Sequence, residues 1–256
     1  MALSRQEERA GEQQLLDAVR ASQSRARVVA VVSGSGGTGA TTTTIGIGFA
    51  FAATREDATV VVDARSGTAS IAARVAGGTR PGVADIARDP WDAAPARSPH
   101  GLYVVDGGPW SRPTRASELD DALGVLTARH AFTLVDVGND LSRPALAALR
   151  AADQVVLVVT TTRAALDGSV MAVERAAEEG PDGVKNLLVA VVCRRAGEFR
   201  RVVTRLQAAE SPGLADVVAV PYDRTLAGGG PVDPSRLSRA TTRAYLSLAA
   251  MISESG

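Results

Sequence analysis

The sequence offers no pair of cysteines for an internal disulfide and no candidate membrane span. Its 256 residues contain a single cysteine, Cys193, so no intrachain disulfide can form. No apolar run approaches the roughly 20 residues that a membrane-spanning helix needs. The first residues, MALSRQEERAGEQQ, are polar and lack the apolar core of a secretory signal. We therefore expect a protein of a reducing cytoplasm.

The sequence also has no net charge and almost no lysine. The 28 basic and 28 acidic residues give a formal net charge of zero, so the whole molecule exerts no strong pull on nucleic acid or anionic lipid. A single lysine, Lys185, stands against 27 arginines. The two histidines, His100 and His130, have no cysteine or acid at metal-ligand spacing, and we assign no metal to them.

Short apolar, β-branched runs alternate with alanine-rich segments from Arg27 onward. Because these runs are almost continuously hydrophobic, we expect strands buried on both faces, in a doubly wound, mainly parallel α/β sheet with helices on both sides. Strands are predicted at residues 28–32, 59–63, 102–106, 132–137, 154–160, 186–192 and 216–220. Helices are predicted at residues 40–53, 68–76, 114–129, 142–151, 164–179, 197–209 and 236–253.

The chain divides into a short extension and one domain. Residues 1–25 are interpreted as a polar, helical extension, and residues 26–256 as a single domain, since a chain of this length can form one sizeable core. Leu15, Leu16 and Val19 form a short apolar stripe on the extension. The stripe favours a helix that docks on the domain, with a partner-binding arm as the alternative.

A glycine loop, SGSGGTGAT, lies between the first predicted strand and the first predicted helix. This arrangement holds phosphate on backbone N–H groups at a helix N-terminus. In the pattern G-x-x-x-x-G-K-[ST], Gly34, Gly39 and Thr41 are in register, but Ala40 stands in place of the lysine. In a loop of this kind Thr41 would hold Mg²⁺ beside the phosphates.

The same glycines fit a second pattern. Gly34, Gly36 and Gly39 spell G-x-G-x-x-G, and Asp63 ends the second predicted strand, where an acid would bind a dinucleotide's ribose. A short-chain reductase would need a Tyr-x-x-x-Lys pair, and Lys185 has a proline four residues before it. An NAD(P)-binding module stays open as an alternative.

An ordered series of motifs resembles the ParA/MinD family of P-loop ATPases over roughly residues 27–253. The family's deviant P-loop reads K-G-G-x-G-K-T-[ST], and this chain has SGGTGATT at that place. VVVDARSG is similar to the second-strand motif, FTLVDVGND to the Walker B strand, and VAVPYDRTLAGGGPVD to the family's Ile-Pro-Tyr-Asp segment. The resemblance implies the family's fold.

The resemblance also implies a site for ATP or ADP with Mg²⁺. It places Thr41, Asp63 and Asp136 around the metal and leaves the catalytic residues unknown, with Asp63 and Arg65 as candidates. The nucleotide-binding residues that it implies are Gly34, Ser35, Gly36, Gly37, Thr38, Gly39, Ala40, Thr41, Thr42, Arg194, Pro221 and Asp223.

Four departures from the family pattern bear on activity. Ser35 replaces a lysine that reaches across the family's dimer, and Ala40 replaces the P-loop lysine. Arg65 replaces the second aspartate of the switch motif, and Cys193 replaces an asparagine that contacts adenine. Because phosphoryl transfer depends on positioning and electrostatics, we expect weak nucleotide binding and slow or absent hydrolysis. An active Mg-ATPase whose site is rebuilt with arginines is the alternative.

The resemblance implies a role for a degenerate family member in the spatial positioning or partition of a chromosome, septum, pilus or secretion machinery in a bacterial cytoplasm. It further implies a homodimer and a protein partner from such a system. Membrane contact is not expected, because the last helix has the pattern of a core-packing helix. A possible nonspecific DNA contact, against the alternative of a solvated helix face, rests on Arg194, Arg195, Arg200, Arg201 and Arg205.

Overall fold

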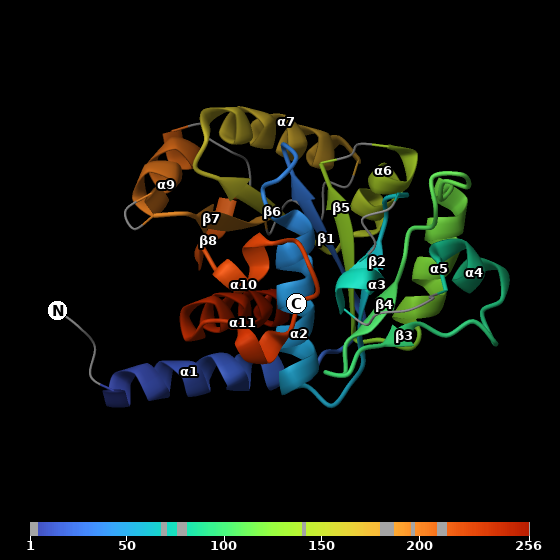
Figure 1. The fold of residues 1–256 in the computed structure, drawn as a ribbon, viewed down its shortest axis with the longest axis horizontal. Helices are drawn as coiled ribbons and strands as arrows, with labels where there is room; N and C mark the ends of the chain where they lie inside the picture. Colours follow the sequence, from blue (N-terminus) through green and yellow to red (C-terminus); the bar gives the residue numbers. More distant parts are fainter. Residues whose placement is uncertain are drawn as a thin grey trace.

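An eight-stranded sheet forms the centre of the molecule (Figure 1). The computed structural model describes residues 5–67, 71–75, 81–139, 142–179, 187–195, 198–208 and 214–255. The strand order is β3-β4-β2-β5-β1-β6-β7-β8, and neighbours are parallel except β3 and β4, which pair antiparallel at one edge. The strands are β1 Arg27–Ser33, β2 Thr59–Asp63, β3 Ala96–Arg97, β4 Tyr103–Val105, β5 Phe132–Gly138, β6 Gln154–Thr160, β7 Leu187–Cys193 and β8 Leu214–Pro221. The predicted mainly parallel α/β sheet is confirmed.

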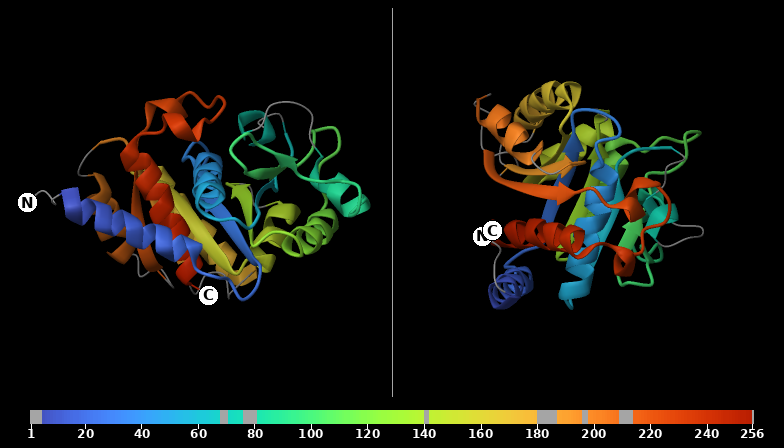
Figure 2. Two further views of the ribbon diagram at one scale, coloured as in Figure 1. Left: turned by 90° about the horizontal axis from the view of Figure 1, so that it is seen from below. Right: turned by 60° about the vertical axis from the view of Figure 1, so that its left-hand side comes forward.

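Helices cover both faces of this sheet, as both views of Figure 2 show. Helices α1, α2, α3 and α11 pack on one face, and α4, α5, α6, α7 and α9 pack on the other. Their bounds are α1 Arg5–Arg20, α2 Ala40–Thr54, α3 Ile71–Val75, α4 Val83–Arg88, α5 Ala116–Thr127, α6 Arg143–Ala151, α7 Arg163–Glu179, α9 Glu198–Ala208, α10 Arg224–Ala227 and α11 Arg239–Glu254, with a 3₁₀ turn at Pro234–Arg236.

The central strands are apolar throughout because each contributes to two cores. In β1, Val28, Ala30 and Val32 face the core under α5, α6 and α7, whereas Val29 and Val31 face the core under α2 and α11. All five of these side chains are buried. A strand with one face in solvent would alternate apolar and polar residues. The continuous apolar runs in the sequence therefore indicate that helices cover both faces of the sheet.

The differences from the predicted elements fall in loop-rich parts of the chain. The strand β3 and the helices α4 and α10 were not predicted, because segments of two to six residues are too short to display a period. Of the helix predicted at residues 68–76, the structure has Ile71–Val75, and the flanking positions lie outside the described residues.

The N-terminal helix α1 lies alongside α11 (Figure 1). Val19 is buried, and Leu15 and Leu16 are partly buried against the same core. The guanidinium of Arg55, the residue after α2, donates a hydrogen bond to the carbonyl of Val19 and a second, 2.8 Å long, to that of Ala21. The apolar stripe of the extension is therefore docked on the domain. Across the described residues, none of the helices has both the length and the apolar character to cross a membrane.

Helix α2 approaches its neighbours through glycine. A Cβ added at Gly46 would lie 2.4 to 2.5 Å from ring atoms of Tyr245 on α11, and one added at Gly48 would lie 2.8 Å from Val61 on β2. Separations this short are steric clashes, so the distance from α2 to both neighbours depends on the missing side chains.

We expect Gly46→Ala to lower the free energy of unfolding by about 1–3 kcal/mol, because the Tyr245 ring must move out of a packed position. The matched control is Gly124→Ala in α5, where a Cβ meets nothing within 4 Å. That change should raise stability by about 0.5–1 kcal/mol, since it adds helix propensity alone. Urea denaturation of both variants measures the difference, and equal effects would contradict the packing argument.

Candidate functional site

The glycine loop joins the end of β1 to the start of α2. Gly37 and Gly39 have φ angles of 75° and 98°, in the left-handed region that favours glycine. The hydroxyls of Ser33 and Thr38 both donate to the carbonyl of Ser35, at 3.2 and 3.3 Å, and hold the loop in shape. Gly39 precedes α2 and has no side chain to cap it, so the first N–H groups of the helix are available to an anion.

Gly34 has a different role from the rest of the loop. A Cβ at this position would lie 2.0 Å from the carbonyl carbon of Gly168 and 2.2 Å from the nitrogen of Ser169. The two glycines therefore bring the backbones of the loop and α7 into contact. Gly34 was predicted to bind nucleotide, but it does not line the cavity described next, and its place in the fold is a packing contact.

A cavity of about 700 Å³ opens in front of the loop, within the usual size of small-molecule sites. It is lined by Ser35 to Thr42 and also by Arg194, Pro221 and Asp223, so these sequence predictions meet in one place. Cys193 does not line it, although both its neighbours Val192 and Arg194 do. The lining residues that the sequence reasoning missed include Arg74, Asn139, Tyr222, Leu226 and Tyr245.

A charged cluster lies beneath the loop, where β2 and β5 end. Asp63 and Asp136 are register partners on these two strands. The Thr41 hydroxyl donates to Oδ2 of Asp136 at 2.6 Å. The Arg65 guanidinium lies among the three: Nη2 is 2.9 Å from Thr41 Oγ1 and 2.7 Å from Asp136 Oδ2, and Nε is 3.3 Å from Asp63 Oδ1.

Burial dominates the electrostatics of this cluster. It raises the pKa of Asp63 to about 7, with a further increase from Asp136 and an opposing effect of Arg65. Burial also raises the pKa of Asp136, again against the effect of Arg65. One guanidinium therefore does not offset the effect of burial on the pKa values of the two carboxylates.

A second guanidinium enters the cavity from α3. Both terminal nitrogens of Arg74 donate to the hydroxyl of Thr42 at 3.1 Å. Burial lowers the pKa of Arg74 from its usual value, while Asp136 opposes that change. Two arginines thus flank Thr41 and Thr42 at the start of α2, close to Ala40, the position at which a P-loop has its lysine. A sequence pattern gives no signal for Arg74, because α3 is five residues long and approaches the loop through the tertiary fold.

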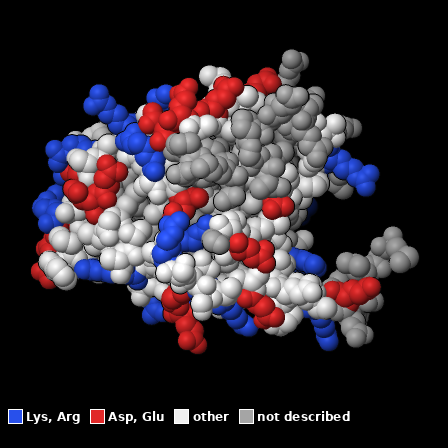
Figure 3. Space-filling view, turned by 180° about the vertical axis from the view of Figure 1, so that it is seen from behind, with Lys and Arg blue, Asp and Glu red and all other residues white. Residues whose placement is uncertain are grey.

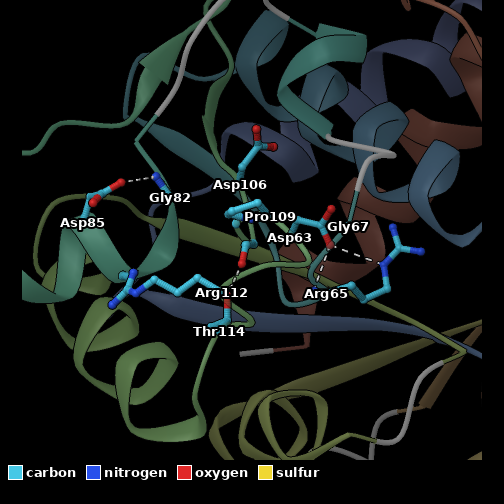
Figure 4. Close-up of a pocket in the computed structure, with 12 residues that line it drawn as sticks. Asp63, Arg65, Gly67, Gly82, Asp85, Asp106, Pro109, Arg112 and Thr114 are labelled. Carbon is cyan, nitrogen blue, oxygen red and sulfur yellow. Dashed lines mark hydrogen bonds and ion pairs between the residues drawn. The ribbon is translucent and has the colours of Figure 1, made fainter.

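Arg65 also borders a smaller neighbouring cavity of about 260 Å³, shown in Figure 4. There Asp63 and Arg65 lie side by side, joined by dashed lines, while Asp106, Arg112 and Thr114 come from other parts of the wall. Asp106, the last residue of the strand predicted at residues 102–106, accepts a hydrogen bond from the backbone N–H of Ala72 at 3.0 Å. It therefore supports the start of α3.

Two further sequence predictions concern Asp223 and a group of five arginines. The carboxylate of Asp223 accepts hydrogen bonds of 2.9 Å from the N–H groups of both Thr225 and Ser238, which ties α10 to the turn before α11. Of the five predicted DNA-contacting arginines, Arg194, Arg195 and Arg200 are exposed, and the side chains of Arg201 and Arg205 lie outside the described set. Over the face in Figure 3, basic and acidic side chains are interspersed.

Solved structures of partition and cell-division ATPases match most of the chain. A ParA family ATPase from Chlorobium tepidum TLS has a TM-score of 0.67 at 15% identity, covering 89% of this chain and 98% of that one. The chain has the ParA/MinD-type fold. The MinC:MinD complex of Aquifex aeolicus (TM-score 0.68, 19% identity, 88% and 94% covered) and Pyrococcus horikoshii MinD with Mg-ADP (0.65, 18%, 88% and 94%) agree.

At these identities the likeness establishes the fold, and function has to be argued from the site. No protein-family model matches the chain, and the comparison with curated proteins found no significant match. The strand order of this ParA/MinD-like fold also bears on the NAD(P) alternative. Dinucleotide-binding folds place β2 beside β1, whereas here β5 lies between them, so Asp63 does not stand where a ribose-binding acid would.

We expect Gly34→Ala to reduce the free energy of unfolding by at least about 1–3 kcal/mol, because the added methyl group forces the loop away from α7. Gly36→Ala in the same loop is the control: its Cβ would meet Asn139 at an ordinary 3.9 Å. It should change stability by less than about 0.5 kcal/mol. Thermal melting compares them, and a harmless Gly34→Ala would show that the loop does not depend on this contact.

Proposed function

We propose that this ParA/MinD-like chain binds ATP or ADP weakly in the 700 Å³ cavity and hydrolyses ATP slowly or not at all. The observation that carries the proposal is the uncapped start of α2 and its glycine loop, which face that cavity beside two guanidinium groups. Backbone N–H groups at a helix start hold phosphate without any side chain. Arg65 and Arg74 add the positive charge that a nucleotide's phosphates require.

Slow hydrolysis follows from how those charges are held. Ala40 presents a methyl group where a P-loop lysine would follow the moving phosphoryl group, and Arg65 already bonds two carboxylates and a hydroxyl. A well-placed cation at the transition state is worth about 10³–10⁵ in rate. The second candidate, an active ATPase rebuilt with arginines, is favoured by the presence of Arg74 in the cavity and requires one of the two guanidiniums to reach the transferring group.

The cellular role that we propose is spatial positioning or partition, as a degenerate relative of the proteins whose fold it shares. MinD of Aquifex aeolicus was solved with MinC, and the Chlorobium protein is a ParA family ATPase. By analogy we propose a homodimer that recruits a protein partner of a partition, division, pilus or secretion system in a bacterial cytoplasm. The proposal does not include nonspecific DNA contact through Arg194, Arg195, Arg200, Arg201 and Arg205, because no described contact supports it.

Titration of the protein with ATP, ADP and NAD tests the proposal. We expect ATP and ADP to bind and NAD not to bind, with turnover of ATP below about 1 s⁻¹, the low end of ordinary enzymes. Ala40→Lys should tighten ATP binding by about tenfold, the effect of one added charge-assisted hydrogen bond. The control Ala53→Lys adds the same charge at the exposed, far end of α2 and should leave the affinity unchanged. Turnover above that limit would favour the rebuilt ATPase, and NAD binding alone would refute the proposal.

The proposed dimer should form without nucleotide. In the family a lysine at the position of Ser35 reaches the partner's phosphates, and a serine hydroxyl carries no charge and is several bonds shorter. Dimer stability must then come from surface burial, for which about 1,000 Å² or more is needed. We expect sedimentation to give the same dimer mass with and without ATP. A monomer that dimerises when ATP is added would contradict this.

A further inference from the structure

The Arg65 guanidinium occupies the place at which a metal would join the site's oxygen ligands. Thr41 Oγ1 uses its proton on Asp136 and accepts a hydrogen bond from Arg65 at 2.9 Å. Asp136 Oδ2 accepts from both groups, while its second oxygen is buried out of reach of solvent. Asp63 Oδ1 accepts from the backbone and side chain of Arg65, at 3.0 and 3.3 Å. Thr41 Oγ1, Asp136 Oδ2 and Asp63 Oδ1 are thus all engaged by Arg65.

The backbone around Arg65 is shaped to hold it there. Gly138, with φ of 63°, lies against the side chain, and a Cβ at that position would be 3.0 Å from Arg65 Cδ and 3.1 Å from Nη1. On the other side, a Cβ at Gly107 would lie 1.6 Å from the Arg65 carbonyl oxygen. Glycines at both contacts let the chain pass close enough to place the guanidinium over Thr41 and Asp136. The position of Arg65 is therefore fixed by close packing against Gly107 and Gly138.

A divalent ion does not fit beside this guanidinium. Mg²⁺ needs oxygen ligands at about 2.0–2.1 Å in octahedral geometry, and Nη2 already stands within hydrogen-bonding distance of both Thr41 and Asp136. A metal would have to displace Arg65 and break its hydrogen bonds to three residues. Among the described residues, no group of three or more His, Cys, Asp or Glu is arranged to hold a metal. The oxygens expected to form a metal shell bind an arginine instead.

We propose that the guanidinium of Arg65 takes the place of the divalent cation, so that this site binds the phosphates of a nucleotide without metal. The inference rests on the proposed nucleotide site. Arg65 is 27% exposed and lines the cavity beside the loop, so it is accessible from the phosphate side while Asp63 and Asp136 anchor it from below. A guanidinium is permanently charged, planar and suited to bidentate contact with phosphate.

The first test compares the wild-type protein in EDTA and in millimolar Mg²⁺, by calorimetric titration with ADP, ATP and pyrophosphate. For each ligand, we expect the dissociation constants in EDTA and in Mg²⁺ to agree within about twofold, which is no larger than the effect of a neutral substitution. Binding that tightens by about tenfold or more with Mg²⁺ would overturn the proposal, since that is the effect of a real ligand contact.

The second test uses Arg65→Gln, with Arg112→Gln as its control. Arg112 borders the neighbouring cavity on a different part of the wall from Arg65 (Figure 4), and it pairs with Glu118. We expect Arg65→Gln to lose about tenfold in metal-free ADP affinity and to regain it with Mg²⁺, because the vacated oxygens become available. Arg112→Gln should behave as wild type. Lost affinity without recovery in Mg²⁺ would overturn the proposal.

Electron paramagnetic resonance of Mn²⁺ without nucleotide separates this inference from the proposed function. Wild type and Arg112→Gln should leave Mn²⁺ free, and Arg65→Gln should bind it. If no variant binds nucleotide but Mn²⁺ follows this pattern, the proposed function fails and the replacement of the metal stands. Mn²⁺ bound by wild type, or by no variant at all, refutes the replacement. If circular dichroism shows that Arg65→Gln is unfolded, the EDTA comparison and wild-type Mn²⁺ binding decide alone.

Discussion

Two carboxylates buried side by side at the ends of neighbouring strands impose the main constraint on this molecule. Enclosing Asp63 and Asp136 raises their pKa values, and Arg65 supplies from within the chain the positive charge that opposes this effect. The position of Arg65 in turn requires close backbone approach at Gly107 and Gly138. The same guanidinium fixes the hydroxyl of Thr41 at the start of α2. Strand ends, loop and helix are thereby joined in one hydrogen-bonded unit.

Most of the sheet could be predicted from the sequence, because a strand that is buried on both faces has an almost continuous run of apolar residues. The run at residues 154–160 is an example: all of it is apolar apart from its ends, and the structure has β6 at those residues. The edge strand β3 could not be found in this way, because two residues that pair with β4 alone need no pattern. Helix α4 follows Pro81 and Gly82 and escaped prediction for the same reason of length.

The part of the candidate site that one continuous stretch of backbone forms was predictable from the sequence. The side chains that enter the site from elements distant in sequence were not. The loop from Ser35 to Thr42 does line a cavity, as its spacing indicated. Gly34 matched the same motif, yet its missing side chain serves contact with α7, which a motif cannot distinguish from contact with phosphate. Arg74 and Tyr245 approach the loop from elements distant in sequence. A long side chain such as that of Arg74 can cover several angstroms in any direction, so the fold decides what it meets.

Helix α11 packs against the N-terminal helix and also lines the cavity. One side of it contacts the N-terminal helix, and its Tyr245 packs on Gly46 and lines the cavity. Helix α11 thus links the terminal extension to the cavity, whereas in sequence residues 21–32 lie between α1 and the glycine loop. A change in how α1 packs on α11 therefore acts on a helix that also lines the cavity, through Tyr245.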